Sequence, residues 1–566
     1  MIKKNIHPFL ATVITFCTCI FILLLYLHGP LDGRFSHFFL PAEKFGIPKA
    51  LQAHGITDMY KGPEETGWDG QFYYYIANDL IGTPDTLAHI DSDAYRYQRI
   101  GLPLLANIVA KLTLRTWVSP LTFYFTNLLI ILLATGVAAA FFQRRQFSPY
   151  FILFWSLGCG TQLTLLNGLP DAMADGLLIM SVIALLDKRN WLYAVLMSLT
   201  ALSREAYVLM PACLGFMMLV QQLRQPTFPF WHWLGKVRFH AVACAIFVIW
   251  QIYLRLHFHT APTQQAEHIL GLPFASAWQF ILEGLRGHHE IVGTGKMAYY
   301  EAIGVILFIL LLGWSLLSAL RLFIKSWRNN PSVDNESCLY LGFSLCFIVL
   351  VLMYYCFGRT VMMHYSGYFK AANLFLFVLP FLTCLRKARP TWYLLAFLCS
   401  VLGFFNMVLS YHVYGEPYHP TPPIQYVTQE PACLTHYDAT ITPLSLEETA
   451  TQNWLKRIVM RHVTTLYTKV TNVSSAPFAP FLGKGEVNVS YQWIDAASGT
   501  VVLDGLRTHL TSSLLPKQST VVPVYITYPK QAGHYLLKIS LVQEGCNWFY
   551  LANSRSAFTI PYTFVA

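Results

Sequence analysis

Apolar stretches long enough to cross a membrane recur along this chain, and they constrain its fold more than any other feature. A helix needs about 20 mainly apolar residues to span the hydrocarbon core of a bilayer. Charged residues make up only 12% of the sequence, against about 25% in typical soluble domains. We therefore predict a polytopic α-helical membrane protein with about eleven transmembrane helices, at roughly 8–27, 118–142, 149–165, 171–186, 191–203, 205–221, 239–256, 299–320, 338–356, 369–384 and 391–412.

Loop charges predict how these helices are oriented. Eleven crossings place the two termini on opposite sides, and basic residues accumulate on the cytoplasmic side. A cytoplasmic N-terminus puts the following basic residues on that side: Lys3, Lys4, Arg144, Arg145, Lys188, Arg189, Arg224, Lys236, Arg238, Arg321, Lys325, Arg328, Arg386, Lys387 and Arg389. With three acidic residues there, these loops carry about +12, more than the formal net charge of +10 for the whole chain. The positive charge therefore reflects orientation, and we predict no nucleic-acid partner.

The first external loop, about residues 28–117, is too long to be a simple connection. Residues 71–79 are rich in aromatic side chains and predict an interfacial helix. Residues 99–113 predict a second, apolar helix with Pro103 in its first turn. Long loops in compact proteins are usually functional, so we expect functional residues in this one.

The C-terminal region changes from apolar runs to alternation with a period of two. Residues 487–493 and 534–541 alternate apolar and polar side chains, and turn signals separate such segments. We predict three parts of the chain: a transmembrane domain at 1–412, a linker at 413–460 and an all-β, immunoglobulin-like sandwich of roughly seven strands at 461–566. Cys433 and Cys546 lie outside the apolar segments, and the sequence leaves open whether they form a disulfide.

Four short motifs of the first half of the chain carry a family resemblance. Two lie in the first external loop: Gly67-Trp68-Asp69-Gly70-Gln71-Phe72-Tyr73-Tyr74-Tyr75-Ile76-Ala77 and Ala94-Tyr95-Arg96-Tyr97-Gln98-Arg99-Ile100-Gly101-Leu102-Pro103-Leu104-Leu105. The others are Asn167-Gly168-Leu169-Pro170-Asp171 and Ser203-Arg204-Glu205. In this order they resemble the GT-C glycosyltransferases, in particular the PIG-V-like mannosyltransferases and bacterial membrane proteins of cell-surface glycopolymer formation. The resemblance covers roughly residues 1–220.

The resemblance implies a hexosyltransferase that depends on a lipid-phosphate sugar. Its donor would be a polyprenyl-phosphate sugar and its acceptor a glycan or a lipid-linked molecule. The reaction would take place at the periplasmic face of a bacterial inner (plasma) membrane, with the C-terminal domain also periplasmic. The resemblance gives Asp69 the position of the catalytic carboxylate, and we expect the site to be supported by Trp68, Gln71, Tyr74, Asp171 and Glu205.

Elementary chemistry is consistent with a catalytic role for Asp69. An acceptor hydroxyl is a weak nucleophile, and a positioned carboxylate can accept its proton during attack. One base is enough for inversion, because the lipid phosphate is already a good leaving group. A structural alternative is that Asp69 caps the helix at 71–79, a common role of aspartate. The run Tyr73-Tyr74-Tyr75 is likewise typical of a membrane-interface belt.

Phosphate binding requires cations, and the outer side offers six candidates: Arg96, Arg99, Arg204, Arg359, His364 and Lys370. A charge between two apolar segments needs a partner, so the structural alternative for Arg204 is a pair with Glu205, Asp171 or Asp175. The alternative for Arg359 and Lys370 is contact with lipid headgroups. For His364 it is an ordinary interfacial histidine.

Two further patterns are given a structural interpretation. Asp91-Ser92-Asp93 has the spacing of a metal-binding DxD triplet, but two carboxylates alone hold Mg²⁺ or Mn²⁺ poorly without phosphate. We interpret it as a solvated turn and predict no metal site and no cofactor; nothing in the sequence supports a need for Mg or Mn. In the C-terminal region Asp504, Glu544 and Trp548 could contact a glycan, but we expect turn or core positions for them, with a hairpin turn at Asp504-Gly505.

Two functions of other classes remain open. A lipid-linked glycan flippase or transporter would place charges near the bilayer midplane and often contains internal repeats. We find no repeat, and the ionisable residues gather at the outer rim. A non-catalytic membrane scaffold for surface polysaccharide assembly would tolerate Asp69→Asn, whereas an enzyme would not. An enzyme also requires Asp69 to lie near Arg204 or Arg359.

Overall fold

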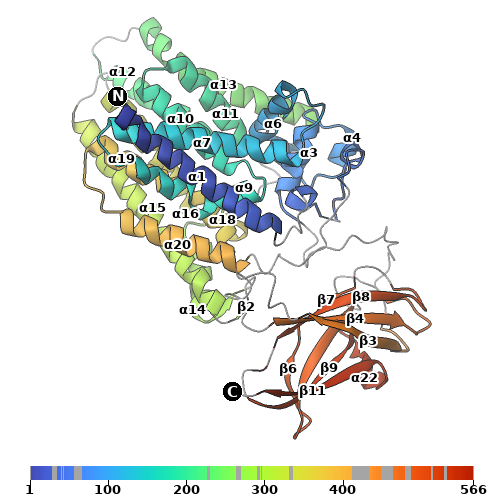
Figure 1. The fold of residues 1–566 in the computed structure, drawn as a ribbon. Coiled ribbons are helices and arrows are strands. Elements are labelled where there is room, and N and C mark those ends of the chain that lie inside the picture. The colour runs from blue at the N-terminus through green and yellow to red at the C-terminus, as the bar shows by residue number, and fades with distance from the viewer. Residues whose placement is uncertain are drawn as a thin grey trace. The chain divides into compact units, whose positions relative to one another are not determined.

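The computed structural model describes most of the chain, and every statement below concerns the residues that it describes: 2–28, 35–39, 41–42, 44–56, 67–225, 230–262, 269–289, 293–294, 296–329, 336–410, 433–447, 463–478, 486–510, 514–527, 529 and 532–564. The chain divides into a helical unit, Met1–Tyr418, and a β unit, His419–Ala566 (Figure 1). The two units are described separately.

Seven segments of the helical unit are long and apolar enough to cross a membrane, which indicates a multi-pass membrane protein. They lie in α1 (Ile2–His28), α7 (Pro120–Arg144), η3 (Glu205–Val208) with α12 (Leu209–Leu223), α13 (Phe230–Phe258), α15 (Lys296–Arg328), α16 (Glu336–Tyr355), and α18 (Tyr365–Ala372) with α19 (Phe375–Arg386). Among the described residues, these seven correspond to seven of the eleven predicted spans.

The other four predicted spans are shorter or interrupted. The segment predicted at 391–412 is α20 (Tyr393–Ser410), and the one at 191–203 is α11 (Asn190–Ser203). The segment predicted at 171–186 is α10 (Asp171–Leu186), whose 16 residues are all buried. A fully buried helix packs against other helices instead of lipid, so a short length is tolerated there.

The predicted span at 149–165 is not one helix. It is divided into η2 (Pro149–Ile152), α8 (Leu153–Ser156) and α9 (Cys159–Leu166). At the break, the Trp155 carbonyl accepts hydrogen bonds from Asn373 Nδ2 at 3.1 Å and Thr161 Oγ1 at 2.7 Å. Buried backbone groups in apolar surroundings require such partners, and hydropathy alone carries no signal for them.

The segment between α1 and α7, predicted as the first external loop, contains the predicted helices. The segment at 71–79 is α3 (Gly70–Asn78), and the segment at 99–113 is α6 (Gly101–Leu112), with Pro103 in its first turn. Both segments are confirmed as helices, but α3 is buried instead of interfacial. Between the two, α5 (Asp93–Tyr97) is a short helix that contacts α3 and α13. The loop is therefore a packed layer on the helical unit, and it carries two of the four motifs.

The β unit contains two antiparallel sheets. In the first, the strand order is β3 (Ala439–Glu447), β4 (Val463–Asn472), β8 (Ser519–Thr527). The second is built from β5 (Val487–Asp495), β6 (Val501–Asp504), β7 (Thr508–His509), β9 (Gly533–Gln543), β10 (Asn547–Trp548) and β11 (Ala557–Phe564). The strands predicted at 487–493 and 534–541 are confirmed as β5 and β9. Apolar side chains of both sheets, among them Val470, Trp493 and Ile539, form one core.

A disulfide ties the start of the described β unit to the turn between β9 and β10. It joins Cys433 and Cys546, whose Cα atoms are 5.7 Å apart. The sequence left this pairing open. The other ten cysteines, all in the helical unit, are free.

Candidate functional site

Two glycines allow the four motifs to approach one another in pairs. A Cβ on Gly70, the first residue of α3, would lie 1.8 Å from the carbonyl oxygen of Asn167, in the turn before α10. A Cβ on Gly101, the first residue of α6, would lie 1.9 Å from Oγ of Ser203, at the end of α11. Only a residue without a side chain allows such an approach. The start of α3, which follows Asp69, therefore lies against the turn before α10.

Arg96 of α5 holds the Asp69 carboxylate. Its Nη2 donates to Asp69 Oδ1 at 2.9 Å, and its Nη2 and Nε donate to the two oxygens of Asp91 at 2.7 and 2.8 Å. The Arg96 side chain is 8% exposed, whereas that of Asp69 is 51% exposed. Oδ2 of Asp69 makes no hydrogen bond to another described residue. One oxygen of this carboxylate is thus fixed, and the other is open to a ligand.

The charges around Asp69 keep it ionised. Burial acts to raise the pKa of its carboxyl, but the positive charges of Arg96, Lys370 and Arg99 act in the opposite direction and hold the pKa below its ordinary value of 3.8. Together these three charges and the hydrogen bond from Arg96 outweigh the effect of burial. Asp69 is therefore a carboxylate, a proton acceptor, at neutral pH.

Asp69 does not cap α3 with its side chain. It stands immediately before the helix, but its backbone is helical and its carboxylate makes no capping hydrogen bond. Helix caps normally have extended backbone and accept from the first turn. The capping alternative is therefore wrong, and the carboxylate binds Arg96 instead.

Arg99 forms a bidentate pair with Glu205. Its Nε and Nη2 donate to the two carboxylate oxygens of Glu205 at 2.9 and 2.7 Å. The two side chains are 16% and 30% exposed. Glu205 begins η3, directly after the extended residue that ends α11, so this pair joins the first external loop to the α11–α12 junction.

Arg204 is buried among two carboxylates and a tyrosine. Its Nη1 lies 3.7 Å from Oδ1 of both Asp171 and Asp175, and it donates to Tyr207 Oη at 3.1 Å. Tyr207 in turn donates to Asp175. The expected structural pairing of Arg204 with Asp171 and Asp175 is present, whereas Glu205 pairs with Arg99 instead.

Lys370 of α18 places a positive charge near the carboxylates of two motifs. Its ammonium acts electrostatically on the carboxylates of both Asp69 and Asp171. Its side chain is half-buried and makes no hydrogen bond and no ion pair within 4.0 Å to the described residues. Arg96 and Arg204 are occupied by such bonds, so Lys370 is the cation of this cluster that retains all its donors for a ligand.

Arg359 and His364 each contact residues outside the four motifs. The Arg359 guanidinium lies over the ring of Phe280, 5.8 Å from its centroid. His364 precedes α18, and its Nε2 lies 3.7 Å from Oε1 of Glu301, a residue of α15 that is only 2% exposed. Glu301 also accepts a hydrogen bond from Tyr368 at 2.7 Å. Sequence analysis missed Glu301, although it is a single acid inside an apolar span, which is a recognised signal.

Three of the predicted supporting residues, Trp68, Gln71 and Tyr74, pack against the helical unit. Gln71 is fully buried; its amide accepts from the Ala42 backbone at 2.8 Å and donates to the Trp68 carbonyl at 3.0 Å. Tyr74 is fully buried and stacks on Phe39 at 4.3 Å between centroids. Trp68 packs against the same core. Tyr73 and Tyr75 are buried as well, so the tyrosine run packs inside the protein and does not form an interfacial belt.

The DxD triplet is engaged by protein groups. Both oxygens of Asp91 bond Arg96, and burial together with the charge of Asp91 raises the pKa of Asp93. Asp91 lies in an exposed bend, as the solvated-turn interpretation expects, and its carboxylate is in addition bonded to Arg96. Across the described residues, no group of three or more His, Cys, Asp or Glu side chains is arranged to hold a metal ion.

Comparisons of the chain with family models, with curated proteins and with solved structures find no match. The case for a function therefore comes from the residues themselves and their geometry.

Proposed function

We propose that this protein is an integral-membrane, GT-C-type glycosyltransferase that transfers a sugar from a polyprenyl-phosphate donor to a cell-surface glycan or a lipid-linked acceptor. The observation that carries the proposal is the half-exposed Asp69 carboxylate, fixed at one oxygen by Arg96 and surrounded by positive charge. A fixed, ionised carboxylate next to cations matches the needs of a reaction between a hydroxyl and a sugar phosphate.

In this reaction Asp69 is the general base. The acceptor hydroxyl oxygen attacks the anomeric carbon, its proton moves to Oδ2 of Asp69, and the bond between that carbon and the phosphate oxygen breaks. Polyprenyl phosphate leaves with the bonding electron pair, and the anomeric configuration inverts. The low pKa makes Asp69 a weak base in the free protein. The negative charge of a bound donor would offset the nearby cations and raise that pKa towards a catalytically useful range.

The cations divide into two roles. Lys370 has three free donors and lies close enough to act on Asp69, so it is the donor-phosphate ligand of this proposal. Arg99 is a second candidate. Its bonds to Glu205 use only Nε and Nη2, so Nη1 can still donate to a phosphate. Arg204 is buried and held by Asp171, Asp175 and Tyr207, so it positions the start of α10.

The finer topology belongs to the same proposal. We place eleven crossings in a bacterial inner membrane, with the N-terminus cytoplasmic and the β unit periplasmic as an immunoglobulin-like sandwich. The short helices α10, α11 and α20 and the broken segment η2–α9 supply the four crossings beyond the seven long ones. The basic loops give the direction.

The test is sugar transfer by the purified, full-length protein. Polyprenyl-phosphate hexoses are offered with alkyl glycoside acceptors, and released polyprenyl phosphate is measured. Asp69→Asn should lower kcat by about 10²–10⁴-fold, the usual contribution of a general base. Asp93→Asn, in the same loop but without a bond to Arg96, is the matched control and should keep activity. Equal turnover by wild type and Asp69→Asn would exclude Asp69 as the base.

A lipid-linked glycan transporter is the second candidate, because carboxylates lie buried within helices of the helical unit. Asp175 is 1% exposed in α10 and Glu301 2% exposed in α15. Intramembrane acids of this kind often mark transport pathways. In proteoliposomes, a transporter would move a polyprenyl-phosphate sugar between leaflets without consuming it, whereas the enzyme would release polyprenyl phosphate.

A further inference from the structure

The outer face of β5 is polar, yet it is buried. Residues of β5 alternate between the core of the β unit and the opposite face, where Asn488, Ser490 and Gln492 are only 1%, 0% and 7% exposed. Buried polar groups are costly unless they are hydrogen-bonded. A second layer of polar and aromatic side chains therefore has to cover this face.

An interruption in the edge strand supplies the centre of that layer. β6 and β7 both pair with β5, so the chain continues along one edge of β5 and residues 505–507 are a break within it. The expected hairpin turn at Asp504-Gly505 is thus wrong. Gly505 approaches β5 so closely that its Cβ would lie 2.5 Å from the Tyr491 carbonyl oxygen. The break places the Arg507 side chain over the buried polar residues of β5.

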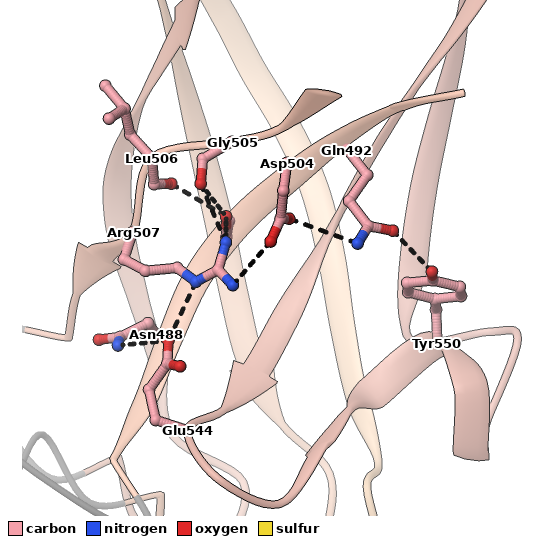
Figure 2. Close-up of polar contacts among 9 residues, drawn as sticks. Asn488, Gln492, Asp504, Gly505, Leu506, Arg507, Glu544 and Tyr550 are labelled. Carbon is pink, nitrogen blue, oxygen red and sulfur yellow. Dashed lines mark hydrogen bonds and ion pairs between the residues drawn. The ribbon is translucent and has the colours of Figure 1, made fainter. Parts of the chain in front are cut away.

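Arg507 organises the whole layer (Figure 2). Its guanidinium donates to Glu544 at 3.0 Å, to Asp504 at 3.1 Å, and to Ser490 and the Gly505 carbonyl at 3.1 and 2.9 Å. Asp504 and Glu544 lie on either side of it, 51% and 33% exposed. Both carboxylates are fixed by these bonds, while part of each remains in contact with solvent.

Two aromatic rings border the carboxylates. The Arg507 guanidinium lies 5.0 Å from the Trp548 ring, and the Lys538 ammonium lies 4.5 Å from the Tyr550 ring. The two ring centroids are 5.8 Å apart at an angle of 56°. Tyr550 donates to Gln492, which donates to Asp504 (Figure 2). Trp548 is half-buried, so the expected core position is wrong for it.

The balance of charge and polarity indicates the ligand class. Two basic and two acidic side chains cancel, and both acids are already paired with Arg507, so the face does not favour a charged ligand. Partly exposed rings beside fixed acceptors and donors match a sugar, whose hydroxyls donate and accept and whose C–H face is apolar. A layer already held by hydrogen bonds loses little entropy on binding.

We propose that this face of the β unit, formed by Asp504, Arg507, Glu544, Trp548 and Tyr550, binds a neutral saccharide. The site is independent of the Asp69 cluster. It gives the protein a second contact with glycan that does not depend on the proposed transferase activity.

The test is saccharide binding by full-length protein in lipid nanodiscs, which avoids glycoside detergents. Calorimetry is carried out with maltohexaose, cellohexaose, mannohexaose and galactohexaose, and with oligogalacturonate as the charged comparison. We expect one or more neutral oligosaccharides to bind, and Trp548→Ala and Asp504→Asn each to weaken binding at least tenfold. Val521→Ala, 51% exposed in β8 of the other sheet, should bind like wild type.

Asp504→Asn keeps the shape of the side chain, so it tests the site even if Trp548→Ala unfolds the β unit. Binding of oligogalacturonate alone, no binding of any of the four neutral probes by wild type, or unchanged binding by a folded Asp504→Asn variant would each overturn the proposal. Asp69→Asn should bind the neutral saccharide normally, which separates this site from the proposed transferase site.

Discussion

At the scale of residues, the charges around Asp69 predict the acid limb of the pH–rate profile. A carboxylate whose pKa is lowered in the folded protein stays ionised above that pKa, and activity is lost as the pH falls through it. The limb of kcat/KM for wild type should therefore lie below pH 3.8. Arg96→Gln removes the largest lowering charge but keeps an amide donor, so the limb should move to higher pH.

The comparison for this prediction is Arg115→Gln, an exposed arginine of the same loop that bonds only Ser119, at 3.3 Å, among the described side chains. Its profile should match that of wild type. Unfolding temperatures of both variants show whether the loop remains folded. A limb that stays in place in a folded Arg96→Gln variant would mean that Asp69 does not control the rate.

Lys370 gives a second prediction at this scale. If its ammonium holds the donor phosphate, Lys370→Met should raise KM for a polyprenyl-phosphate sugar about tenfold or more, since a lost charged contact to phosphate costs about 1.5–3 kcal/mol. Lys370→Arg should recover much of the affinity. Lys325→Met, an exposed lysine near the end of α15, is the control and should leave KM unchanged. If Lys370 instead contacts lipid headgroups, Lys370→Met should have the same KM as the control.

Sequence alone could predict some of these residues and not others. It could predict that Arg204 pairs with one of Glu205, Asp171 and Asp175, because a charge between apolar segments needs a partner. It could not predict that Glu205 pairs with Arg99 instead. It could not predict that Arg96 bonds both Asp69 and Asp91, since that pairing depends on how α5 packs beside α3. For the same reason, Asp504 and Trp548 could not be told from turn and core residues until the break in the β5 edge was known.

At the scale of elements, two helix starts depend on glycine. Gly70→Ala and Gly101→Ala each place a Cβ within 2 Å of another atom, so we expect loss of transfer and a clearly lower unfolding temperature. The cost of overpacking is typically about 1–3 kcal/mol and more against rigid backbone, as at Gly70. Gly235→Ala, in α13 with nothing within 4 Å of its Cβ, should be neutral or stabilising. An active, stable Gly70→Ala variant would contradict the packing of α3 on the turn before α10.

The element scale also shows what hydropathy leaves out. The helices α3 and α6 could be located from local signals other than hydropathy, namely aromatic content and an N-terminal proline. Hydropathy merged η2, α8 and α9 into one span, because the Asn373 amide that satisfies the break at Trp155 comes from more than 200 residues further along the chain.

At the scale of the whole molecule, the Cys433–Cys546 disulfide tests the orientation of the chain. It joins residues 113 positions apart. Disulfides persist in oxidising compartments and are rare in the cytosol. If the β unit is periplasmic, both thiols should be blocked in intact cells, and alkylation after denaturation should modify Cys433 and Cys546 only when a reductant is added first. Free cysteines such as Cys356 should be modified without reductant.

The same bond predicts where stability is lost. Closing a loop of about 100 residues is worth about 4–5 kcal/mol in the chain-entropy estimate, so Cys433→Ser with Cys546→Ser should lower the unfolding temperature of the β unit. Because the bond lies wholly within that unit, the helical unit and the transfer activity should change little. If both thiols of wild type are alkylated before reduction in freshly lysed cells, the β unit is cytoplasmic. The charge-based orientation would then be reversed, and Asp69 could not act on the periplasmic face.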